Sequence, residues 1–549
     1  MSIEDQIDRL LDRGASRRDF LRGSAVAGAG LLLPGVLAAC SGSGSSSAET
    51  TGTDTTAATG TATRGGRLVI GLHDGGADDT LSPWAIPTFN GAARAQQVYE
   101  RLFTFGPNGA PVPRLAVSAE GNSSATVWQV KLRPDVQFHN GKTMDAQDVM
   151  YSLQYVVDPK NKAESSARAS SIDFNASKIV SPTEIEFHLK RPVGDFQALL
   201  AEKALWIVPK GTKDFTKQAI GTGPFTSESF KPGVSALFKK YSDYWGLTAT
   251  TGPYVDELEI QTLLDGSARV NALLAGQIQE MTNIDFVAAK AQANNAALRL
   301  VKTPQPNAGA IYMALESKQF RDNRVRQAMR LIPDRSAFVD NVALGFGSVG
   351  NDLFGKGQPS YDATIPQREH DPEKAKSLLK AAGYDGLSLT LPTSDAAPGM
   401  LATAALYRQQ AAAAGVTITL KKIPADSHYG NQYYLKPAGF FYQTQWSQGF
   451  ESMAQDGLLK GSPYNETQWY RSDWETQFFK AQGIVDPAER NAAYRALQEP
   501  LWNEGGYIIP FVYLTLDAAS PKVQGIVPNV SSGFQNLGGF EFKDHWLKS

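Results

Sequence analysis

The sequence has little of the residue types that build most metal and disulfide sites. Its 549 residues include one cysteine and six histidines, which excludes a disulfide framework and a cysteine-based zinc site. No two histidines stand three or four positions apart, so the sequence contains no helical imidazole pair. Lysine and arginine total 53 and aspartate and glutamate 55, whereas a nucleic-acid-binding surface needs a basic excess. We therefore expect no metal, no cofactor and no nucleic-acid partner.

Common catalytic motifs are also missing, since neither Gly-x-Ser-x-Gly nor His-Glu-x-x-His occurs. Residues 345–350, GFGSVG, fit the dinucleotide pattern GxGxxG, but they follow a helical stretch expected over 323–344, whereas that fingerprint follows a strand and opens a helix. Residues 377–380 spell SxxK inside a helix expected from Asp371, without companion motifs. We expect both to be ordinary structural segments, and we expect that the protein is not an enzyme.

The first 63 residues indicate an export signal and a tether. Arg17 and Arg18 precede a nearly uncharged run over 23–39, which is typical of a twin-arginine export signal. The sequence LAA immediately before Cys40 resembles a bacterial lipobox, which predicts that Cys40 is lipidated. Residues 41–63 consist almost wholly of serine, glycine, threonine and alanine, which predicts a flexible tether because such a segment buries little apolar area.

From residue 64 onward, strand and helix patterns alternate, which predicts a mixed α/β fold. The apolar run at 68–70 predicts a buried strand, and the alternating or β-branched runs at 128–132 and 416–420 predict two more.

Helix starts are marked by acidic caps. Asp145, with Asp148 three residues later, predicts a helix that runs through Tyr155. The tripeptide Asp-Pro-Glu at 371–373 predicts a second helix, which Gly383 ends.

Aromatic residues make up 10% of the chain, and that supply suits a ligand cleft, which is typically lined by apolar and aromatic side chains with few polar anchors. Most of them are expected in the core. Five stand in polar, turn-like surroundings and are candidates for a cleft: Trp84, Tyr312, Trp446, Tyr464 and Trp469.

Several segments together resemble one protein family. Residues 128–153, WQVKLRPDVQFHNGKTMDAQDVMYSL, look like the signature segment of the family 5 extracellular solute-binding proteins of peptide/nickel-type ABC importers. The segments at 65–71, 221–225, 322–335 and 371–384 are similar to further motifs of that family. The resemblance covers about residues 65–545.

This resemblance implies an α/β fold of the periplasmic-binding-protein type II class, with two hinged lobes and an inserted subdomain. The implied boundaries are 1–39 for the signal peptide, 40–63 for the tether, 64–307 for lobe I with an inserted subdomain near 85–207, 308–512 for lobe II, and 513–549 for a return to lobe I.

The function that the resemblance implies is capture of a small solute, foremost a di- or oligopeptide, between the lobes and delivery to an ABC permease driven by an ATPase. We expect a monomer, exported to the periplasm or cell surface and held at the membrane by lipidated Cys40. Alternatives with the same fold are binding of a nickel chelate, a sugar or another organic solute, and a role as a sensor. A lipid-anchored hydrolase is a remote alternative, because no nucleophile or metal constellation is found.

Ligand contacts are expected from seven residues. They are Trp84, Tyr312, Asn351, Asp352, Trp446, Glu451 and Asp456. One departure from the family concerns the aspartate that, in peptide binders, follows a Gly-Trp pair and holds the α-ammonium of the ligand. Here Gln445 and Trp446 are followed by SQGFE, without that aspartate, and Glu451 or Asp456 would have to replace it.

Overall fold

The computed structural model describes most of the chain beyond residue 60. The described residues are 61–84, 88–107, 109–161, 163, 169–203, 205–215, 219–424, 428, 440–445, 449–462, 464–529 and 535–548. They lie within one compact unit that spans residues 57–549. Within them no helix is both long and apolar enough to cross a membrane.

The largest sheet joins nine strands of the described chain. Its order is β16 (Phe440–Gln445), β12 (Arg299–Met313), β17 (Tyr507–Ala519), β11 (Glu280–Met281), β1 (Arg67–Leu72), β10 (Glu257–Thr262), β9 (Ser235–Lys240) and β8 (Phe225–Lys231), with β13 (Gly347–Val349) paired to β17. Strand β1 is parallel to both of its neighbours, β10 and β11.

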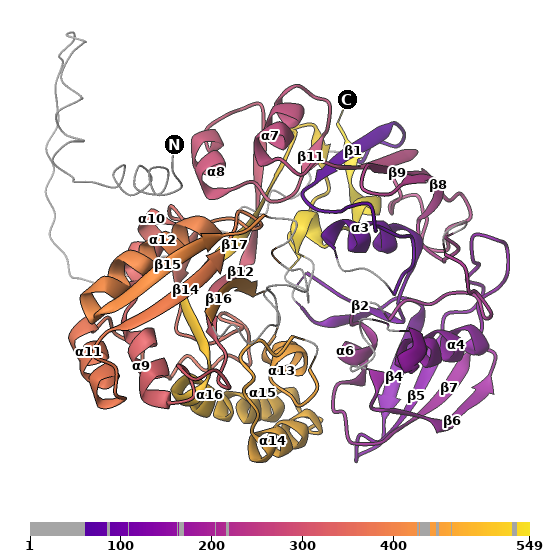
Figure 1. The fold of residues 1–549 in the computed structure, drawn as a ribbon. Helices are drawn as coiled ribbons and strands as arrows, with labels where there is room; N and C mark the ends of the chain where they lie inside the picture. Colours follow the sequence, from indigo (N-terminus) through magenta and orange to yellow (C-terminus); the bar gives the residue numbers. More distant parts are fainter. Residues whose placement is uncertain are drawn as a thin grey trace, which may run out of the picture. The chain divides into compact units, whose positions relative to one another are not determined.

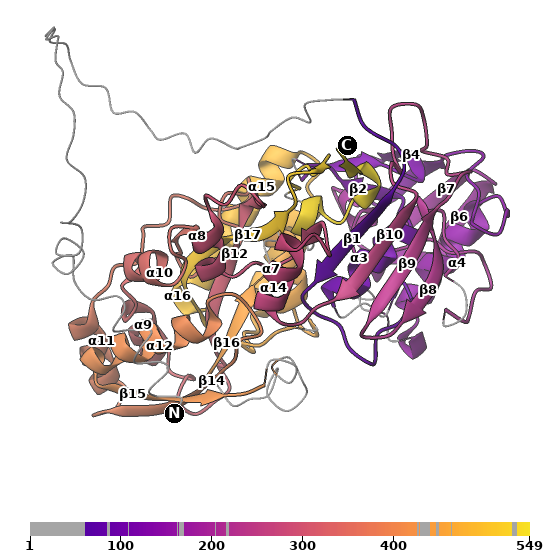
Figure 2. The ribbon, with the colours of Figure 1, turned by 90° about the horizontal axis from the view of Figure 1, so that it is seen from above.

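Two long antiparallel strands, β12 and β17, carry the chain from one side of the molecule to the other (Figure 2). At one end β17 pairs with β11, and at the other end β12 pairs with β16. The β12–β17 register shifts between Thr303 and Pro306, so the pairing is irregular part-way along the two strands.

A separate four-stranded antiparallel sheet follows β1 in the sequence. Its order is β4 (Ala116–Gly121), β5 (Val127–Leu132), β7 (Glu184–Leu189) and β6 (Ile172–Ser181). The helices on this side are α3 (Phe89–Val98), α4 (Ala146–Val157) and α6 (Phe196–Leu200), and a short hairpin joins β2 (Phe103–Phe105) to β3 (Pro111–Pro113) (Figure 1).

The other side is mainly helical around a parallel pair of strands, β14 (Leu387–Thr393) and β15 (Val416–Lys422). Its helices are α9 (Asn323–Leu331), α10 (Arg335–Asn341), α11 (Pro372–Ala381), α12 (Met400–Ala411), α13 (Phe450–Gly457), α14 (Ser472–Gln482), α15 (Pro487–Ala496) and α16 (Gln498–Glu504). Helices α7 (Gly266–Leu274) and α8 (Phe286–Gln292) lie between β10 and β12 in the sequence.

The apolar side chains form three hydrophobic clusters. The first draws on residues 68–260 and takes in Val301 and residues 519–542, the second draws on residues 270–298 and 311–518, and the third draws on residues 308–512. The second cluster takes residues from both sides of the lobe boundary expected at 307/308, so the clusters do not test that boundary. The lobe boundaries stay a prediction.

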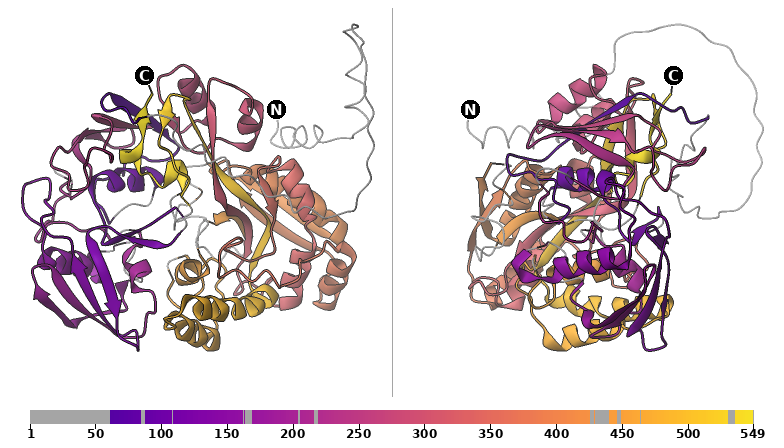
Figure 3. Two further views of the ribbon diagram at one scale, coloured as in Figure 1. Left: turned by 180° about the vertical axis from the view of Figure 1, so that it is seen from behind. Right: turned by 90° about the vertical axis from the view of Figure 1, so that its right-hand side faces the viewer.

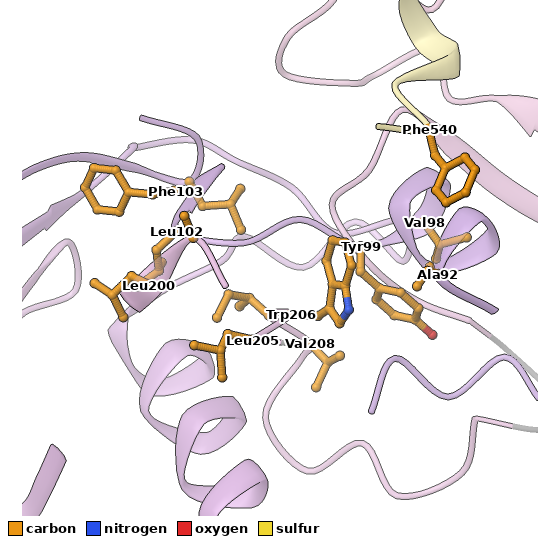
Figure 4. Close-up of a cluster of buried hydrophobic side chains, with 14 of the residues drawn as sticks. Ala92, Val98, Tyr99, Leu102, Phe103, Leu200, Leu205, Trp206, Val208 and Phe540 are labelled. Atoms are coloured by element: carbon orange, nitrogen blue, oxygen red, sulfur yellow. The ribbon is translucent and has the colours of Figure 1, made fainter. Parts of the chain in front are cut away.

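The C-terminal segment packs beside the start of the described chain. Figure 4 shows Phe540 near Val98 and Ala92 of α3, within the first cluster. The short strands β18 (Val523–Gln524) and β19 (Trp546–Leu547) pair with each other, and the yellow C-terminal segment runs beside indigo β1 (Figure 3).

Most elements expected from the sequence are present. The expected strands are β1, β5 and β15, and α4 has a full capping box in which the Asp145 and Asp148 side chains each accept the other's backbone N–H. The helical stretch expected over 323–344 is wrong in one respect, because it consists of two helices. Helix α9 ends before Pro333, because proline has no backbone N–H to donate within a helix. Asp334 then caps the start of α10.

Candidate functional site

Trp84, the first of the expected ligand contacts, packs within the first cluster. Its ring is 3% exposed and stacks on Tyr155 of α4 at 4.1 Å between centroids, while Phe215 meets it edge-on at 5.3 Å. The indole Nε1 is buried and finds no hydrogen-bond acceptor among the described residues. The indole Nε1 atoms of Trp128 and Trp206 are buried in the same way, so this feature does not set Trp84 apart.

Tyr312 and Asn351 lie on the other side of the molecule. Tyr312 is on β12, 1% exposed, and belongs to the third cluster. The Asn351 side chain binds two other segments: it donates to the carbonyl of Pro366 at 3.1 Å and accepts from the backbone N–H of Arg368 at 2.9 Å, and it accepts from the indole of Trp502 on α16 at 3.2 Å. Asn351 therefore holds together the segments that surround α16.

The carboxylate of Asp352 is fully buried and has strong partners. It accepts from Arg335 Nη2 at 2.9 Å, from Arg368 Nε at 2.7 Å and from the backbone N–H of Ile509, on β17, at 2.8 Å. Burial alone would raise its pKa, but the charges of Arg335 and Arg368 outweigh this, and the pKa lies below its usual value. Asp352 is thus a charged group that ties α10 to β17.

The arginines near Asp352 also bind the C-terminal end of α16. Arg330 donates to the carbonyls of Asn503 and Gly505, Arg326 to that of Glu504, and Arg368 to that of Trp502. These carbonyls have no partner inside the helix and carry its negative dipole end. The arrangement satisfies them with cations.

Glu451 and Asp456 both lie on α13. The Glu451 carboxylate accepts from Gln482 Nε2 of α14 at 2.9 Å. Burial raises the pKa of Glu451, and the hydrogen bond from Gln482 opposes that shift. Asp456 is half-buried, and its carbonyl accepts the backbone N–H of Tyr464. Five positions of helix separate the two acids by about 140°, so they point to different surroundings.

Four expected residues lie outside the described residues. They are the ligand candidate Trp446, the lipidation candidate Cys40, and Arg17 and Arg18 of the export signal. Of the remaining six ligand candidates, Tyr312 is a member of the third cluster. Asn351 and Asp352 lie next to that cluster, because the two residues that follow them in the sequence, Leu353 and Phe354, are members. Glu451 is near the same cluster through α13, whereas Trp84 belongs to the first cluster.

Sequence reasoning missed a buried polar group on the long strands. Thr515 of β17 accepts from Asn307 Nδ2 at 2.7 Å and donates to Gln535 Oε1 at 3.3 Å, and the hydroxyl of Thr303 donates to the carbonyl of Gln535 at 3.2 Å. The signal was present in β17, where Thr515 and Asp517 interrupt an apolar run of 13 residues that is buried almost throughout.

A second missed network surrounds Asp517. Its carboxylate accepts from the backbone N–H groups of Asn283 and Leu537 and from Asn536 Nδ2. Burial raises its pKa to about 6. His73 Nε2 lies 2.8 Å from Asn283 Nδ2, and burial lowers the histidine pKa, so the neutral ring accepts this hydrogen bond.

The segments that resemble family motifs have structural roles. Asp148, in the signature segment, has no exposed side-chain area and pairs with Lys142. His139 Nε2 lies 2.9 Å from the carbonyl of Gly223, and Thr222 donates to the buried carboxylate of Glu100 at 3.0 Å. These contacts fasten the signature segment and the GTGPF turn to the first cluster.

The motifs set aside above behave as expected. Residues 347–349 of the GFGSVG run form β13, a strand paired with β17, and open no helix. Ser377 and Lys380 of the SxxK run are exposed on α11. Among the described residues, no three histidine, cysteine, aspartate or glutamate side chains are grouped closely enough to hold a metal ion.

The model of the bacterial extracellular solute-binding proteins, family 5 middle region, matches residues 110–465. The chain belongs to this family. Members are non-enzymatic carriers that bind a small solute for an ABC importer. A twin-arginine translocation signal matches residues 14–34, which includes Arg17 and Arg18, and together these findings indicate export.

Individual relatives cover nearly the whole chain. The glutathione-binding protein GsiB of Salmonella paratyphi A is 26% identical over 492 residues, which are 85% of this chain and 92% of that protein. DppA of Helicobacter pylori, solved with the peptide STSA, superposes with a TM-score of 0.76 at 20% identity, over 89% of this chain and 99% of that one. NikZ of Campylobacter jejuni, solved with Ni(L-His), superposes with a TM-score of 0.75 at 20% identity, over 87% and 99%. These likenesses confirm the type II periplasmic-binding-protein fold.

Proposed function

We propose that this chain is the lipid-anchored, extracytoplasmic solute-binding subunit of an ABC importer and that its solute is a short peptide. The observation that carries the proposal is the match over 92% of GsiB, whose name states that it binds glutathione, itself a tripeptide. DppA, solved with a tetrapeptide, has the same fold. The match to NikZ makes a metal–histidine chelate the ligand to test against.

The proposed mechanism is closure of two lobes around the peptide. Strands β12 and β17 join the two sides of the molecule, and their register shift between Thr303 and Pro306 suits a bending point because regular pairing is interrupted there. Contacts that exist only in the closed form make the bound state favourable and shift the equilibrium towards closure. The closed form then docks on the permease.

Within this mechanism, the expected ligand residues take different parts. We assign direct contacts to Trp84, Tyr312, Trp446, Glu451 and Asp456. Asn351 and Asp352 are assigned to positioning, because the Asp352 oxygens already accept from Arg335, Arg368 and Ile509.

The peptide amine requires a negative partner. Burial raises the pKa of Glu451, which favours its neutral form. A bound ammonium group would favour its charged form. Asp456, further along the same helix, is the alternative anchor.

The test is a thermal-shift titration of the full chain carrying Cys40→Ser, unfolded and refolded to remove bound solute. The probes are glutathione, the peptide STSA and Ni(L-His). A ligand at 100 times its Kd adds about 2.7 kcal/mol to the free energy of unfolding. The proposal is supported if a peptide raises the unfolding temperature of the parent chain and this rise disappears in Glu451→Gln or Asp456→Asn. The rise should persist in the control Glu499→Gln, on the exposed side of α16. A shift with Ni(L-His) alone contradicts the peptide assignment.

Anchoring and transport need the cell. The wild-type chain should sediment with membranes, and Cys40→Ser should release it into the soluble fraction. Loss of peptide uptake on deletion of the gene supports an importer subunit, whereas normal uptake with a lost transcriptional response to peptide supports the sensor alternative.

A further inference from the structure

The two sides of the molecule meet a second time, away from the strands that join them. Asp195 caps the start of α6, whose residue Phe196 belongs to the first cluster, and Arg490 lies on α15, whose residue Tyr494 belongs to the third. Arg490 Nη2 donates to Asp195 Oδ2 at 2.9 Å, and the two side chains are 9% and 28% exposed. In Figure 1, α6 lies beside α13 and α15.

The backbones also touch at this contact. The N–H of Gly194 donates to the carbonyl of Gln482, the last residue of α14, at 2.8 Å. A Cβ atom at Gly194 would lie 1.9 Å from the carbonyl oxygen of Ile484, so only glycine permits this approach. On the opposite face of the contact, a Cβ at Gly483 would lie 2.9 Å from Pro192.

Side chains extend the contact to α13. Arg191 lies over the ring of Phe479 at 4.4 Å and its Nε donates to Gln482 Oε1 at 3.3 Å. The other end of the same amide, Gln482 Nε2, donates to Glu451. One glutamine side chain therefore connects the first side of the molecule to a residue that we assign to the ligand.

We propose that this contact, formed by Arg191, Gly194 and Asp195 against Gln482, Ile484 and Arg490 and called here the clasp, sets the fraction of ligand-free protein that is closed. The clasp is small and polar, which suits a reversible interface. Its consequence for affinity rests on the proposed function: the apparent Kd equals the intrinsic Kd divided by the closed fraction, so the clasp tunes affinity for every ligand alike.

Asp195→Asn is the cleanest perturbation. Asparagine caps a helix as well as aspartate does, so the hydrogen bond from the N–H of Ala198 to this side chain is kept while the charge is lost. Arg490 is less suitable because its Nη1 also binds the carbonyls of Ile484 and Val485. The matched control is Asp371→Asn, which makes the same change at the cap of α11.

The readout is hydrogen–deuterium exchange at the Gly194 amide, which is protected only while the clasp is closed, measured on the ligand-free full chain with Cys40→Ser. We expect exchange at Gly194 to rise by up to about fivefold in Asp195→Asn, with a larger radius of gyration in solution scattering and no change at Val130 in β5.

Equal exchange rates at Gly194 in wild type, Asp195→Asn and Asp371→Asn would overturn the proposal. A rise in exchange at Val130 as large as the rise at Gly194 would also overturn it, because equal rises at both sites indicate general unfolding. Failure of the proposed function looks different: no peptide binds, yet Gly194 exchange still responds to Asp195→Asn. If peptides bind, the Kd for glutathione and for STSA should rise by the same factor in Asp195→Asn, and unequal factors would contradict a clasp that acts only on closure.

Discussion

The buried carboxylate of Asp352 offers the sharpest stability test. Its side chain has no exposed area and lies between Arg335 and Arg368, with a third bond from the N–H of Ile509. The backbone at residue 352 is left-handed, with φ of 58°, a conformation that asparagine also tolerates. Asp352→Asn therefore removes the charge while keeping the size and the backbone.

The expected loss of stability comes from the two arginines that stay buried after the substitution. Two buried guanidinium groups lose their only carboxylate partner among the described residues, and removing one member of a buried ion pair costs about 3–5 kcal/mol. The matched control is Asp334→Asn at the half-buried cap of α10, where asparagine caps equally well and the cost should stay below about 1 kcal/mol. Denaturant unfolding monitored by circular dichroism measures both variants.

The pH dependence gives a second criterion for the same variant. The folded-state pKa of Asp352 is lowered, so its contribution is complete above the unfolded-state pKa, which is about 3.9, and is lost as the pH falls through the folded value. The difference between wild type and Asp352→Asn should be constant above about pH 5 and shrink towards acid. A cost below about 1 kcal/mol at pH 7, or a difference that does not shrink in acid, would refute the reasoning.

Three further predictions concern other parts of the chain. Gly194→Ala should open the clasp, since the new Cβ would meet Ile484 at 1.9 Å, and solution scattering should show a larger radius of gyration than for Gly76→Ala, which has open space. Asp145→Ala removes both cap bonds of α4 and should lower the free energy of unfolding by about 1 kcal/mol, measured by denaturant titration. Asp517 has a pKa raised to about 6, so its stabilising effect is complete below the unfolded value and is lost as pH rises through 6. Asp517→Asn should therefore flatten the fall in stability, of about 3 kcal/mol, between pH 4 and pH 7 in unfolding titrations.

The sequence was sufficient for elements whose cause is local. The capping box at Asp145 and Asp148, the proline and acid at the start of α11, and the alternating strand β15 all rest on interactions within a few residues. Family resemblance supplied the fold class. The helix break at Pro333 was also a local signal, and the longer helix expected there neglected it.

The site residues depended on contacts across long stretches of sequence. Asp352 was expected to meet a ligand, but the structure gives it partners 17 and 16 positions away and a third, Ile509, 157 positions away. The clasp joins Asp195 to Arg490 across 295 positions. No spacing or composition marks such a pair, because in the sequence Asp195 is an ordinary helix cap and Arg490 an ordinary arginine of a helix.

The proposed closure needs two sides that stay rigid while the contact between them opens, and the strengths of the interactions suit that requirement. Within the second half, Asp352 and its arginines are buried with several bonds each, and breaking them costs about 3–5 kcal/mol. Across the clasp, the Asp195 and Arg490 side chains are 28% and 9% exposed, so solvent reaches this pair and it contributes less than a fully buried one. Thermal energy and solvent can therefore open the clasp long before they disturb the ion cluster at Asp352. Under the proposed function, a ligand at Glu451 would act on the clasp and not on the ion cluster, through the Gln482 amide that Glu451 shares with Arg191.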